Sequence, residues 1–354
     1  MTPDSDPVRL CVRGRVCLFG EHSDWAADFG LHTGFCLVVG TDQTMGGRAR
    51  GADFFRVTTR LLPPGGAGSP PVARQVQCPW TDRDLLAAAQ DAHEFFRYCA
   101  GTAHELKALP GVTGGLDLDI DQVDLPLGKG VASSAAVCIL VAKAFDAAYG
   151  LRLFPHELMR LAYRGERLTG SQCGRMDQAC IYGKIPVLLS FEREAFVRVD
   201  PIPVGGPIEM FFVDLGGAKD TVAILGDLRR AYLGSAGMKQ ALGAGNEGLV
   251  RQAIGALAAG DAAALGELMT RSQRAFDERV APHSPVQLAS PLLHSLLNWP
   301  ELAGHVHGGK GVGSQGDGTA QFVARSAADR DEAMKKIEAA FPGMRCYRLS
   351  IPPC

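Results

Sequence analysis

The sequence has 354 residues, of which 46% are hydrophobic and 21% are charged. That length and composition suffice for two domains, or one large domain, with a substantial core. The net charge is −2, and Lys and Arg do not cluster with interleaved aromatic residues, which argues against a surface for nucleic acid or anionic membranes. We expect small molecules as partners.

The N-terminal residues, the longest apolar run and the cysteines bear on localisation. The start, MTPDSDP, has Asp and Pro where a secretory signal needs basic residues and an apolar run. The longest apolar run, Val131–Ala142, is shorter than the ~20 residues of a membrane span. The 10 cysteines are scattered without a C-x-x-C pair, as is typical of free, mostly buried thiols in a reducing compartment. We expect a cytoplasmic protein without a membrane span.

The first expected strand is Val8–Phe19, which is rich in β-branched and apolar residues. It leads into the polar segment Gly20–Trp25, where two carboxylates, an imidazole and an indole follow one another closely. Loops carried by rigid strands often bear binding groups. The alternative is an ordinary polar turn whose Trp25 packs on the core.

Further strands are expected at 35–40, 53–59 and 116–123, and one helix is expected over Trp80–Cys99. Residues 116–123 alternate between apolar and acidic or polar types, so we expect an edge strand with a solvated acidic face. The Pro/Gly-rich segment Leu62–Ala73 is expected to be an exposed loop.

The stretch Leu125–Ala136, LPLGKGVASSAA, follows this strand and runs into an apolar, alanine-rich segment expected to be a helix. A strand, a glycine-rich turn and a helix start together offer unpaired N–H groups to phosphate. Taken alone, the stretch is better explained as a capped loop before a buried helix. Whether this stretch binds phosphate therefore has to be judged together with other segments of the chain.

A helix starting at Pro155 carries Glu166, and the segment CGRMDQ that follows contains Asp177. Small and apolar neighbours make Asp177 a candidate buried carboxylate, which needs a partner or a function. On one continuous helix Glu166 and Asp177 would lie about three turns apart and would not touch. A loop through Gly170–Gly174 could instead bring both to one metal and phosphate.

In the C-terminal half we expect strands at 185–191, 209–215 and 321–324 and helices at 222–232 and 247–275. Lys219–Thr221 follow a strand and could reach a cleft, although a surface turn with Asp220 as helix N-cap is the more economical interpretation. Strands and helices alternate in both halves, which indicates an α+β arrangement of two lobes.

Four separate segments together resemble the signature motifs of the GHMP kinases, the superfamily of galactokinase, homoserine kinase, mevalonate kinase and phosphomevalonate kinase. RGRVCLFGEHSDW, at 13–25, resembles the first motif in its galactokinase form. LPLGKGVASSAA resembles the second, phosphate-binding motif, and GGKGVGSQGDGTAQFVA, at 308–324, resembles the third more loosely. CGRMDQ, at 173–178, resembles the segment that holds the catalytic aspartate of galactokinases.

The resemblance implies a fold and a division of the chain. The fold would be α+β and two-lobed, with an N-terminal lobe like domain 2 of ribosomal protein S5 and a ferredoxin-like C-terminal lobe. Residues 1–190 would form the nucleotide-binding lobe and residues 191–354 the C-terminal lobe. The partners would be a sugar and ATP, and the protein would be a monomer or a homodimer.

The resemblance also implies roles for individual residues. Asp177 would be the catalytic base, and Arg15 would stabilise it and the migrating phosphoryl group. Ser134 and Glu166 would hold Mg²⁺. The sugar would be bound by Glu21, His22, Asp24 and Trp25, and the phosphates of ATP by Gly128, Lys129, Gly130, Val131, Ala132, Ser133 and Ser134, with Gly311, Gly313 and Gly316 lining the cleft.

The sequence departs from the family pattern at several positions. Val131 and Ala132 replace the usual Leu-Gly of the second motif, a small change that should leave the backbone cradle usable. Gln315 and Asp317 occupy the third motif where small residues are usual, and an acid near phosphate is unfavourable unless it faces the sugar or the metal. Trp25 replaces the tyrosine of galactokinases, which puts galactose itself in doubt.

These features imply an ATP-dependent kinase that uses Mg²⁺ and phosphorylates a hydroxyl, the anomeric one included, of a monosaccharide or uronic acid. One alternative is a mevalonate-type kinase of a non-sugar alcohol, and the polar EHSDW segment argues against it. A second is a non-catalytic sensor that binds sugar and nucleotide. The joint presence of Ser134, Glu166, Asp177 and Arg15 argues against the sensor.

Overall fold

The computed structural model of the protein describes residues 6–30, 33–61, 72–91, 96–193 and 196–354. The chain forms two compact units. Unit 1 consists of Met1–Gly14 and Gln43–Gly183, and unit 2 of Arg15–Asp42 and Lys184–Cys354. This grouping places Arg15–Asp42 with the C-terminal residues, and the functional division after residue 190 stays a prediction. Two strands contribute residues to both units: β1 (Val8–Phe19) and β2 (Gly34–Ala52).

Unit 1 is built on strands in the order β4-β3-β5-β2. Strand β5 alternates as expected, with Leu116, Leu118 and Ile120 buried. The expectation of an edge strand is wrong, because β5 pairs with β3 on one side and with β2 on the other. Its acidic face is neutralised within the sheet, where Asp117 accepts hydrogen bonds from Arg56 at 2.6 and 2.8 Å. The strands other than β2 are β3 (Phe54–Leu61), β4 (Val72–Pro79) and β5 (Gly115–Val123).

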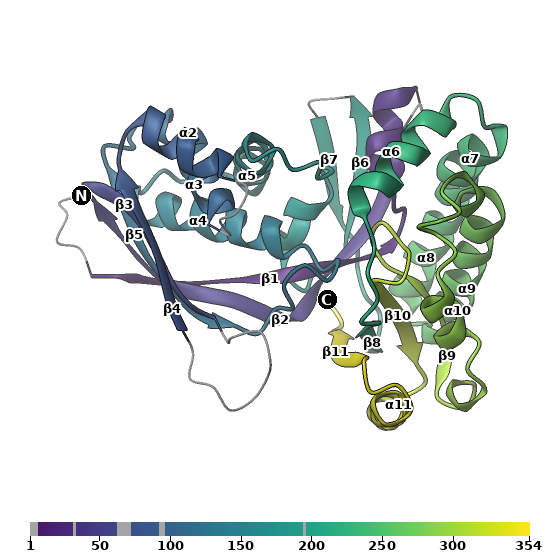
Figure 1. Ribbon diagram of the computed structural model, residues 1–354. Helices are drawn as coiled ribbons and strands as arrows, with labels where there is room; N and C mark the ends of the chain where they lie inside the picture. The colour runs from purple at the N-terminus through teal and green to yellow at the C-terminus, as the bar shows by residue number, and fades with distance from the viewer. Residues whose placement is uncertain (1–5, 31–32, 62–71, 92–95, 194–195) are drawn as a thin grey trace. The chain divides into compact units, whose positions relative to one another are not determined.

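Helices α2 to α5 lie together on one side of the unit 1 strands (Figure 1). The single helix expected over 80–99 is wrong: the first helix ends where Asp91 takes an extended conformation (φ −72°, ψ 102°). Residues 92–95, and 62–71 of the expected Pro/Gly-rich loop, lie outside the described residues. The helices are α2 (Asp82–Gln90), α3 (Arg97–Lys107), α4 (Ser133–Tyr149), α5 (Pro155–Leu168) and the 3₁₀ helix η2 (Asp177–Tyr182).

Unit 2 contains an antiparallel sheet in the order β11-β8-β10-β9. Chain order is strand, helices, two strands, helix and strand, which is the ferredoxin-like topology expected for the C-terminal half. Phe211 and Phe322 pair across adjacent strands and stack with ring centroids 5.1 Å apart. The strands are β8 (Ile208–Asp214), β9 (Val306–Gly311), β10 (Thr319–Ala324) and β11 (Arg345–Ile351).

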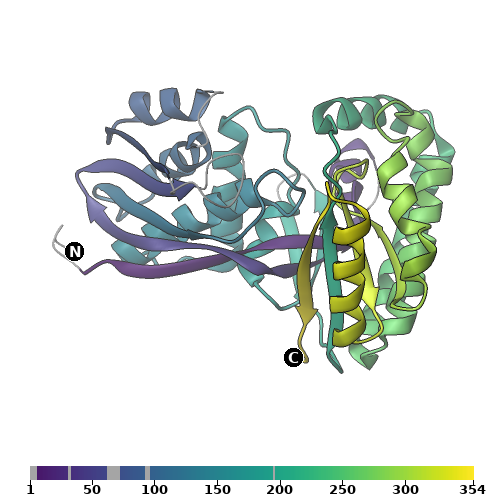
Figure 2. The same cartoon turned by 60° about the horizontal axis from the view of Figure 1, so that its bottom comes forward.

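Helices α10 (Pro291–Leu297) and α11 (Ala327–Ala340) cover the face of this sheet that carries Phe211 and Phe322. Figure 2 shows α11 lying along the sheet beside β11. Their apolar side chains, among them Leu293 and Ile337, complete one core of unit 2. Strand β6 (Val187–Arg193) pairs with the first part of β2 and with β7 (Phe196–Pro201).

A second core of unit 2 joins Trp25 and Tyr232 to Phe276. The helix expected over 247–275 is wrong as a single element, because it breaks at Gly260 (φ +67°), after which Asp261 caps a new helix by accepting from the Ala264 N–H at 2.9 Å. The remaining helices are α1 (Ser23–Ala26), η1 (Ala27–Phe29), α6 (Thr221–Tyr232), α7 (Ala236–Gln240), η3 (Ala241–Gly245), α8 (Asn246–Ala259), α9 (Ala262–Arg279), η4 (Ala281–His283) and η5 (Pro300–Leu302).

The expected α+β fold is therefore confirmed. All 10 cysteines are free, and five of them are buried. Across the described ranges, every helix is too short or too polar to traverse a lipid bilayer.

Truncating Ile337 tests the core beneath α11. The Ile337 side chain is fully buried, so Ile337→Ala is expected to lower the free energy of unfolding by about 2–5 kcal/mol. Denaturant titration followed by circular dichroism measures the change. The exposed neighbour Glu332 on the same helix provides the control variant Glu332→Ala, and equal stability of the two variants would contradict the packing described.

Candidate functional site

In unit 1, the glycine-rich stretch turns sharply before α4. Gly128 (φ +71°) and Gly130 (φ +75°) take left-handed conformations that favour glycine. Ala132 (φ +60°, ψ 42°) does so as well, at a cost of roughly 1–2 kcal/mol for a residue with a Cβ. The family pattern has glycine at this position, and the backbone conformation explains why. Ala132 keeps the same turn at some cost in strain.

Helix α4 begins without a side chain that caps its first N–H groups. Its N-cap residue is Ala132, which has no polar side chain. The hydroxyl of Ser133 accepts a hydrogen bond from the Gly128 N–H at 3.1 Å and so closes the loop rather than the helix. Ser133 and Ser134 are partly exposed. The first turn of α4 thus presents backbone donors and the positive end of the helix dipole.

Beside this loop lies a buried carboxylate, Glu166 of α5, with only 1% of its surface exposed. Its Oε2 accepts a hydrogen bond from Gln178 Nε2 at 2.9 Å, and Ser134 and Cys173 also hydrogen-bond to it. Helix α5 ends at Leu168, which excludes the continuous-helix interpretation. The chain then returns, so that the charge of Asp177 acts on Glu166.

The environment of Glu166 disfavours its ionised form. Burial, and after it the neighbouring Asp177 carboxylate, together raise the pKa of Glu166 from 4.5 to about 7 against the opposing hydrogen bonds. A cation would relieve this cost. The predicted Mg²⁺ ligands, Ser134 and Glu166, are adjacent oxygen donors, which fits a Mg²⁺ ion that takes one or two protein ligands and completes its shell with phosphate and water.

The described residues do not include a cluster of three or more His, Cys, Asp or Glu able to hold a metal by themselves. A site of two protein ligands is therefore incomplete without ligands from a bound phosphate or from solvent. That is the usual situation for Mg²⁺ in enzymes that handle nucleotides.

In unit 2, β1 delivers the polar segment Gly20–Trp25. Gly20 (φ +99°) is required, because a Cβ there would lie 2.0 Å from the carbonyl oxygen of Phe35. His22 takes a left-handed conformation (φ 71°) as the N-cap of α1. This tight turn buries Glu21, His22, Ser23, Asp24 and Trp25, each with 6% or less of its surface exposed.

Glu21 forms a buried ion pair with Lys310 of β9. The side chains are 5% and 1% exposed, respectively. Lys310 Nζ also donates to the Gly311 carbonyl at 2.9 Å, and the Gly311 N–H donates to Gln273 Oε1 at 2.8 Å. Lys310 was not among the predicted site residues. The sequence feature that could have indicated Lys310 is a lysine flanked by glycines in a strand expected to be buried.

The imidazole of His22 has a fixed tautomer. Trp25 Nε1–H donates to His22 Nδ1 at 3.0 Å, so the proton of the neutral ring resides on Nε2. Burial, and after it the positive charges of Lys219, Lys310 and Arg229, together lower the pKa of His22 from 6.5 to about 3, against a hydrogen bond with the Ser314 backbone. His22 is therefore neutral at physiological pH, and its Nε2–H can act only as a donor.

Trp25 packs into the core of unit 2. Its ring meets Tyr232 edge-to-face, with centroids 5.6 Å apart, and it belongs to the cluster that contains Phe276. This is the arrangement of the alternative interpretation, in which the indole is buried on the core. The polar contact of the Trp25 side chain is its hydrogen bond to His22.

The third glycine-rich segment forms the turn between β9 and β10. Gly313, Gln315 and Gly316 all have positive φ, and the Gln315 side chain donates to the Gly311 carbonyl at 3.3 Å. Asp317 Oδ1 accepts from the Leu293 N–H at 2.9 Å. The acid that is unfavourable near phosphate thus caps the first turn of α10.

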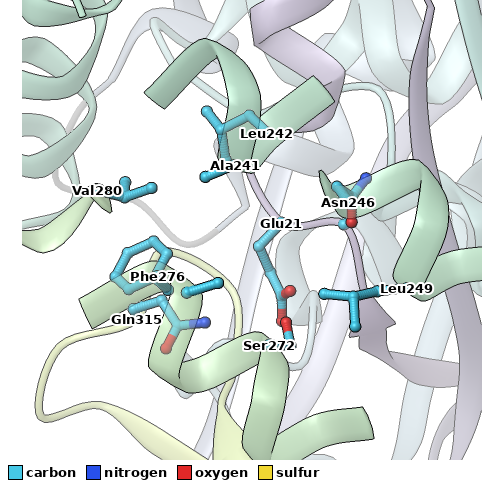
Figure 3. A pocket seen from close by; sticks show the side chains of 11 residues that line it. Glu21, Ala241, Leu242, Asn246, Leu249, Ser272, Phe276, Val280 and Gln315 are labelled. Carbon is cyan, nitrogen blue, oxygen red and sulfur yellow. The ribbon is translucent and has the colours of Figure 1, made fainter. Parts of the chain in front are cut away.

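A small cavity of about 30 Å³ lies next to Glu21 within unit 2. Figure 3 shows the Glu21 carboxylate pointing toward Ser272, with Leu249 and Phe276 on either side. A space of this size holds a water molecule or two and is far below the ~300 Å³ of small ligand pockets. In this structure the space beside the ion pair is therefore too small to hold a sugar.

The predicted site residues fall into two groups. Unit 1 brings together the loop before α4, Ser134, Glu166 and Asp177. Unit 2 brings together the segment after β1 and the third glycine-rich turn. The predicted catalytic residues Asp177 and Arg15 belong to different units, and their roles remain predictions.

The stability of unit 1 is expected to depend on pH through Glu166. Because its pKa is raised on folding, the folded state binds the proton more tightly, and this stabilisation is lost as the pH rises from about 4.5 through about 7. The loss is on the order of 3 kcal/mol. Thermal melting across this range checks it, and a Glu166→Gln variant with an unchanged pH dependence would contradict the assignment.

Removing Lys310 is expected to be strongly destabilising. Lys310→Met leaves Glu21 buried without its cation, which costs about 3–5 kcal/mol of unfolding free energy. Denaturant titration measures the loss, with the exposed Lys335→Met as control. The double variant Glu21→Gln/Lys310→Met should regain part of the stability. A double variant no more stable than Lys310→Met would argue against the pair.

Part of this chain matches a known protein family. Residues 85–184 match the family described as GHMP kinases N terminal domain. A galactokinase from Roseiflexus sp. (strain RS-1) is 29% identical over 196 residues, which are 54% of this chain and 44% of that protein. The match therefore spans less than half the length of that curated relative.

Two solved structures cover almost the whole chain. The L. major mevalonate kinase in complex with R-mevalonate has a TM-score of 0.73 at 21% identity, covering 99% of this chain and 98% of that one. The Lactococcus lactis galactokinase complexed with galactose also has a TM-score of 0.73, at 17% identity, covering 99% and 94%. At these identities the likeness shows the fold. The family match covers residues 85–184 and concerns the N-terminal domain of the GHMP kinases.

Proposed function

We propose that this chain is an ATP-dependent kinase that phosphorylates a hydroxyl of a monosaccharide or a uronic acid. The observation that carries the proposal is the cluster of Ser134, Glu166 and Asp177 beside the glycine-rich loop in unit 1. Members of the GHMP kinase family are ATP-dependent kinases, and the matched domain, residues 85–184, contains this cluster.

Phosphoryl transfer needs positioned phosphates, neutralised charge and a group that orients or accepts the hydroxyl proton. The loop from Gly128 to Ser134 supplies backbone donors for the phosphates. Mg²⁺ held by Ser134 and Glu166 would neutralise phosphate charge. Asp177 is partly exposed at the start of η2, whereas Glu166 is buried, so Asp177 is the carboxylate suited to accept a proton from a substrate.

Unit 2 supplies groups suited to a polyol. His22 offers a donor from Nε2, and its neutral state does not change near physiological pH. Asp24 is a buried carboxylate on the same turn, suited to accept from a sugar hydroxyl. Arg15, buried on β1, carries a charge that can stabilise a phosphoryl group. These residues favour a substrate with several hydroxyls over mevalonate, which has two hydroxyls and a carboxylate.

A screen of substrates tests the proposal. Monosaccharides, uronic acids and mevalonate would each be incubated with the full chain, ATP and Mg²⁺, and ADP formation followed in a coupled assay. Turnover of a sugar or uronic acid supports the proposal. Turnover of mevalonate alone would establish the non-sugar alternative, and nucleotide binding without any turnover would establish the sensor.

Asp177→Asn is expected to lower kcat by about 10²–10⁴-fold, because it removes the group that accepts the hydroxyl proton. The dissociation constant for ATP should change little, because the lost interaction is made in the transition state. Steady-state kinetics and nucleotide titration measure the two effects. Asp82, whose side chain is 71% exposed, gives the control Asp82→Asn. A near-normal kcat in Asp177→Asn would refute its assignment.

A further inference from the structure

Lys219 lies in an unusual setting between β8 and α6 in unit 2. The residue is partly buried, and its Nζ donates to the Gln315 carbonyl of the third glycine-rich turn at 3.0 Å. Among the described residues, no carboxylate lies within ion-pair distance of it. Lysines that lose part of their contact with water are often paired with an anion, and the hydrogen bond to a neutral carbonyl does not supply that charge.

The surrounding structure holds Lys219 in place. Gly318 leaves room for it, because a Cβ there would lie 2.6 Å from Lys219 Cε and 2.7 Å from Nζ. Two residues on, Thr221 Oγ1 is 3.2 Å from Ser314 Oγ. Between them, Asp220 caps α6 as expected by accepting from the Ala223 N–H at 3.0 Å. The segment Lys219–Thr221 is therefore held against the third glycine-rich turn by specific contacts.

The charged groups that face Lys219 are mostly positive or already engaged. Arg15 on β1 is close enough for its charge to act on Lys219, and Lys219 acts in turn on His22. Asp220 is occupied as the cap of α6, and Asp317 is occupied by the Leu293 N–H of α10. Two cations thus lie near each other without a carboxylate assigned to Lys219.

We propose that Lys219, together with Arg15, binds an anionic group of the ligand against the turn that carries Ser314 and Gln315. The inference rests on the proposed function, in which the anion is either the phosphoryl group or the carboxylate of a uronic acid. Of the three N–H donors of the ammonium group, one is given to Gln315, which leaves two for such an anion.

The proposal has a consequence for pH dependence. Burial and the charge of Arg15 lower the pKa of Lys219 from 10.5 to about 8. An anion is bound by the protonated form, so its affinity is highest below that pKa and falls as the pH rises through about 8. An arginine at the same position stays charged throughout this range. Lys219→Arg should therefore still bind the anion, and its affinity should no longer fall as the pH rises.

The experiment measures the sulfate dissociation constant of the full chain by calorimetry, because sulfate keeps its charge across this pH range. Lys219→Met is expected to weaken sulfate binding about tenfold or more. Lys219→Arg should bind as the unmodified protein does at neutral pH. The control variant Lys335→Met, at an exposed position on α11, should have the same sulfate dissociation constant as the unmodified protein. Melting curves verify that each variant is folded.

A second arm compares binding of a uronic acid with that of its neutral hexose. Loss of sulfate binding in Lys219→Met assigns the site to a phosphoryl group. Loss confined to the uronic acid assigns it to a substrate carboxylate. The inference would be overturned if Lys219→Met bound both sulfate and the uronic acid as tightly as the unmodified protein does. It would also be overturned if the affinity of Lys219→Arg for sulfate still fell with rising pH. These experiments measure binding and not turnover. If the chain phosphorylated no sugar, the proposed function would be refuted, and the binding measurements would still decide whether Lys219 binds an anion.

Discussion

The buried ion pair between Glu21 and Lys310 is the interaction on which the arrangement of unit 2 depends most. Removing two charges from water costs several kcal/mol per ion, and that cost is offset only because the pair is close and Lys310 also reaches the Gly311 carbonyl. The pair joins the segment after β1 to β9, so the first and third motifs form one framework. Burial, and after it the positive charges of Lys219 and Lys310, lower the pKa of His22 and keep it neutral.

The buried carboxylate of unit 1 has a different electrostatic environment. This carboxylate, Glu166, is hydrogen-bonded by neutral groups and not by a cation, and the charge of Asp177 opposes its ionisation. Glu21 is paired with a cation within the fold, whereas the hydrogen-bond donors given for Glu166 are neutral groups. The two buried carboxylates therefore differ in how the fold compensates their charge.

Local patterns predicted much of the fold: β1, the alternating β5 and the glycine-rich start of α4 all depend on neighbouring residues. The breaks at Asp91 and Gly260 were missed, because apolar spacing continues across them. The contacts of Lys310 and Lys219 could not be predicted from local patterns, since their partners Glu21 and Gln315 lie far away in sequence. The assignment of β5 as an edge strand failed because Arg56, on another strand, makes its acidic face compatible with the interior of a sheet.

The segment Arg15–Asp42 is separated in sequence from the rest of unit 2 but is bound to it by specific polar contacts. Besides Glu21 and Lys310, Asn246 Nδ2 donates to Ser23 Oγ at 2.9 Å, and Gln321 Nε2 donates to the Cys17 carbonyl at 2.6 Å. A chimera that exchanged this segment with the matching one of a related protein would therefore have to bring matching residues on α8, β9 and β10. In this chain, exchange of the segment is limited by unit 2 as a whole.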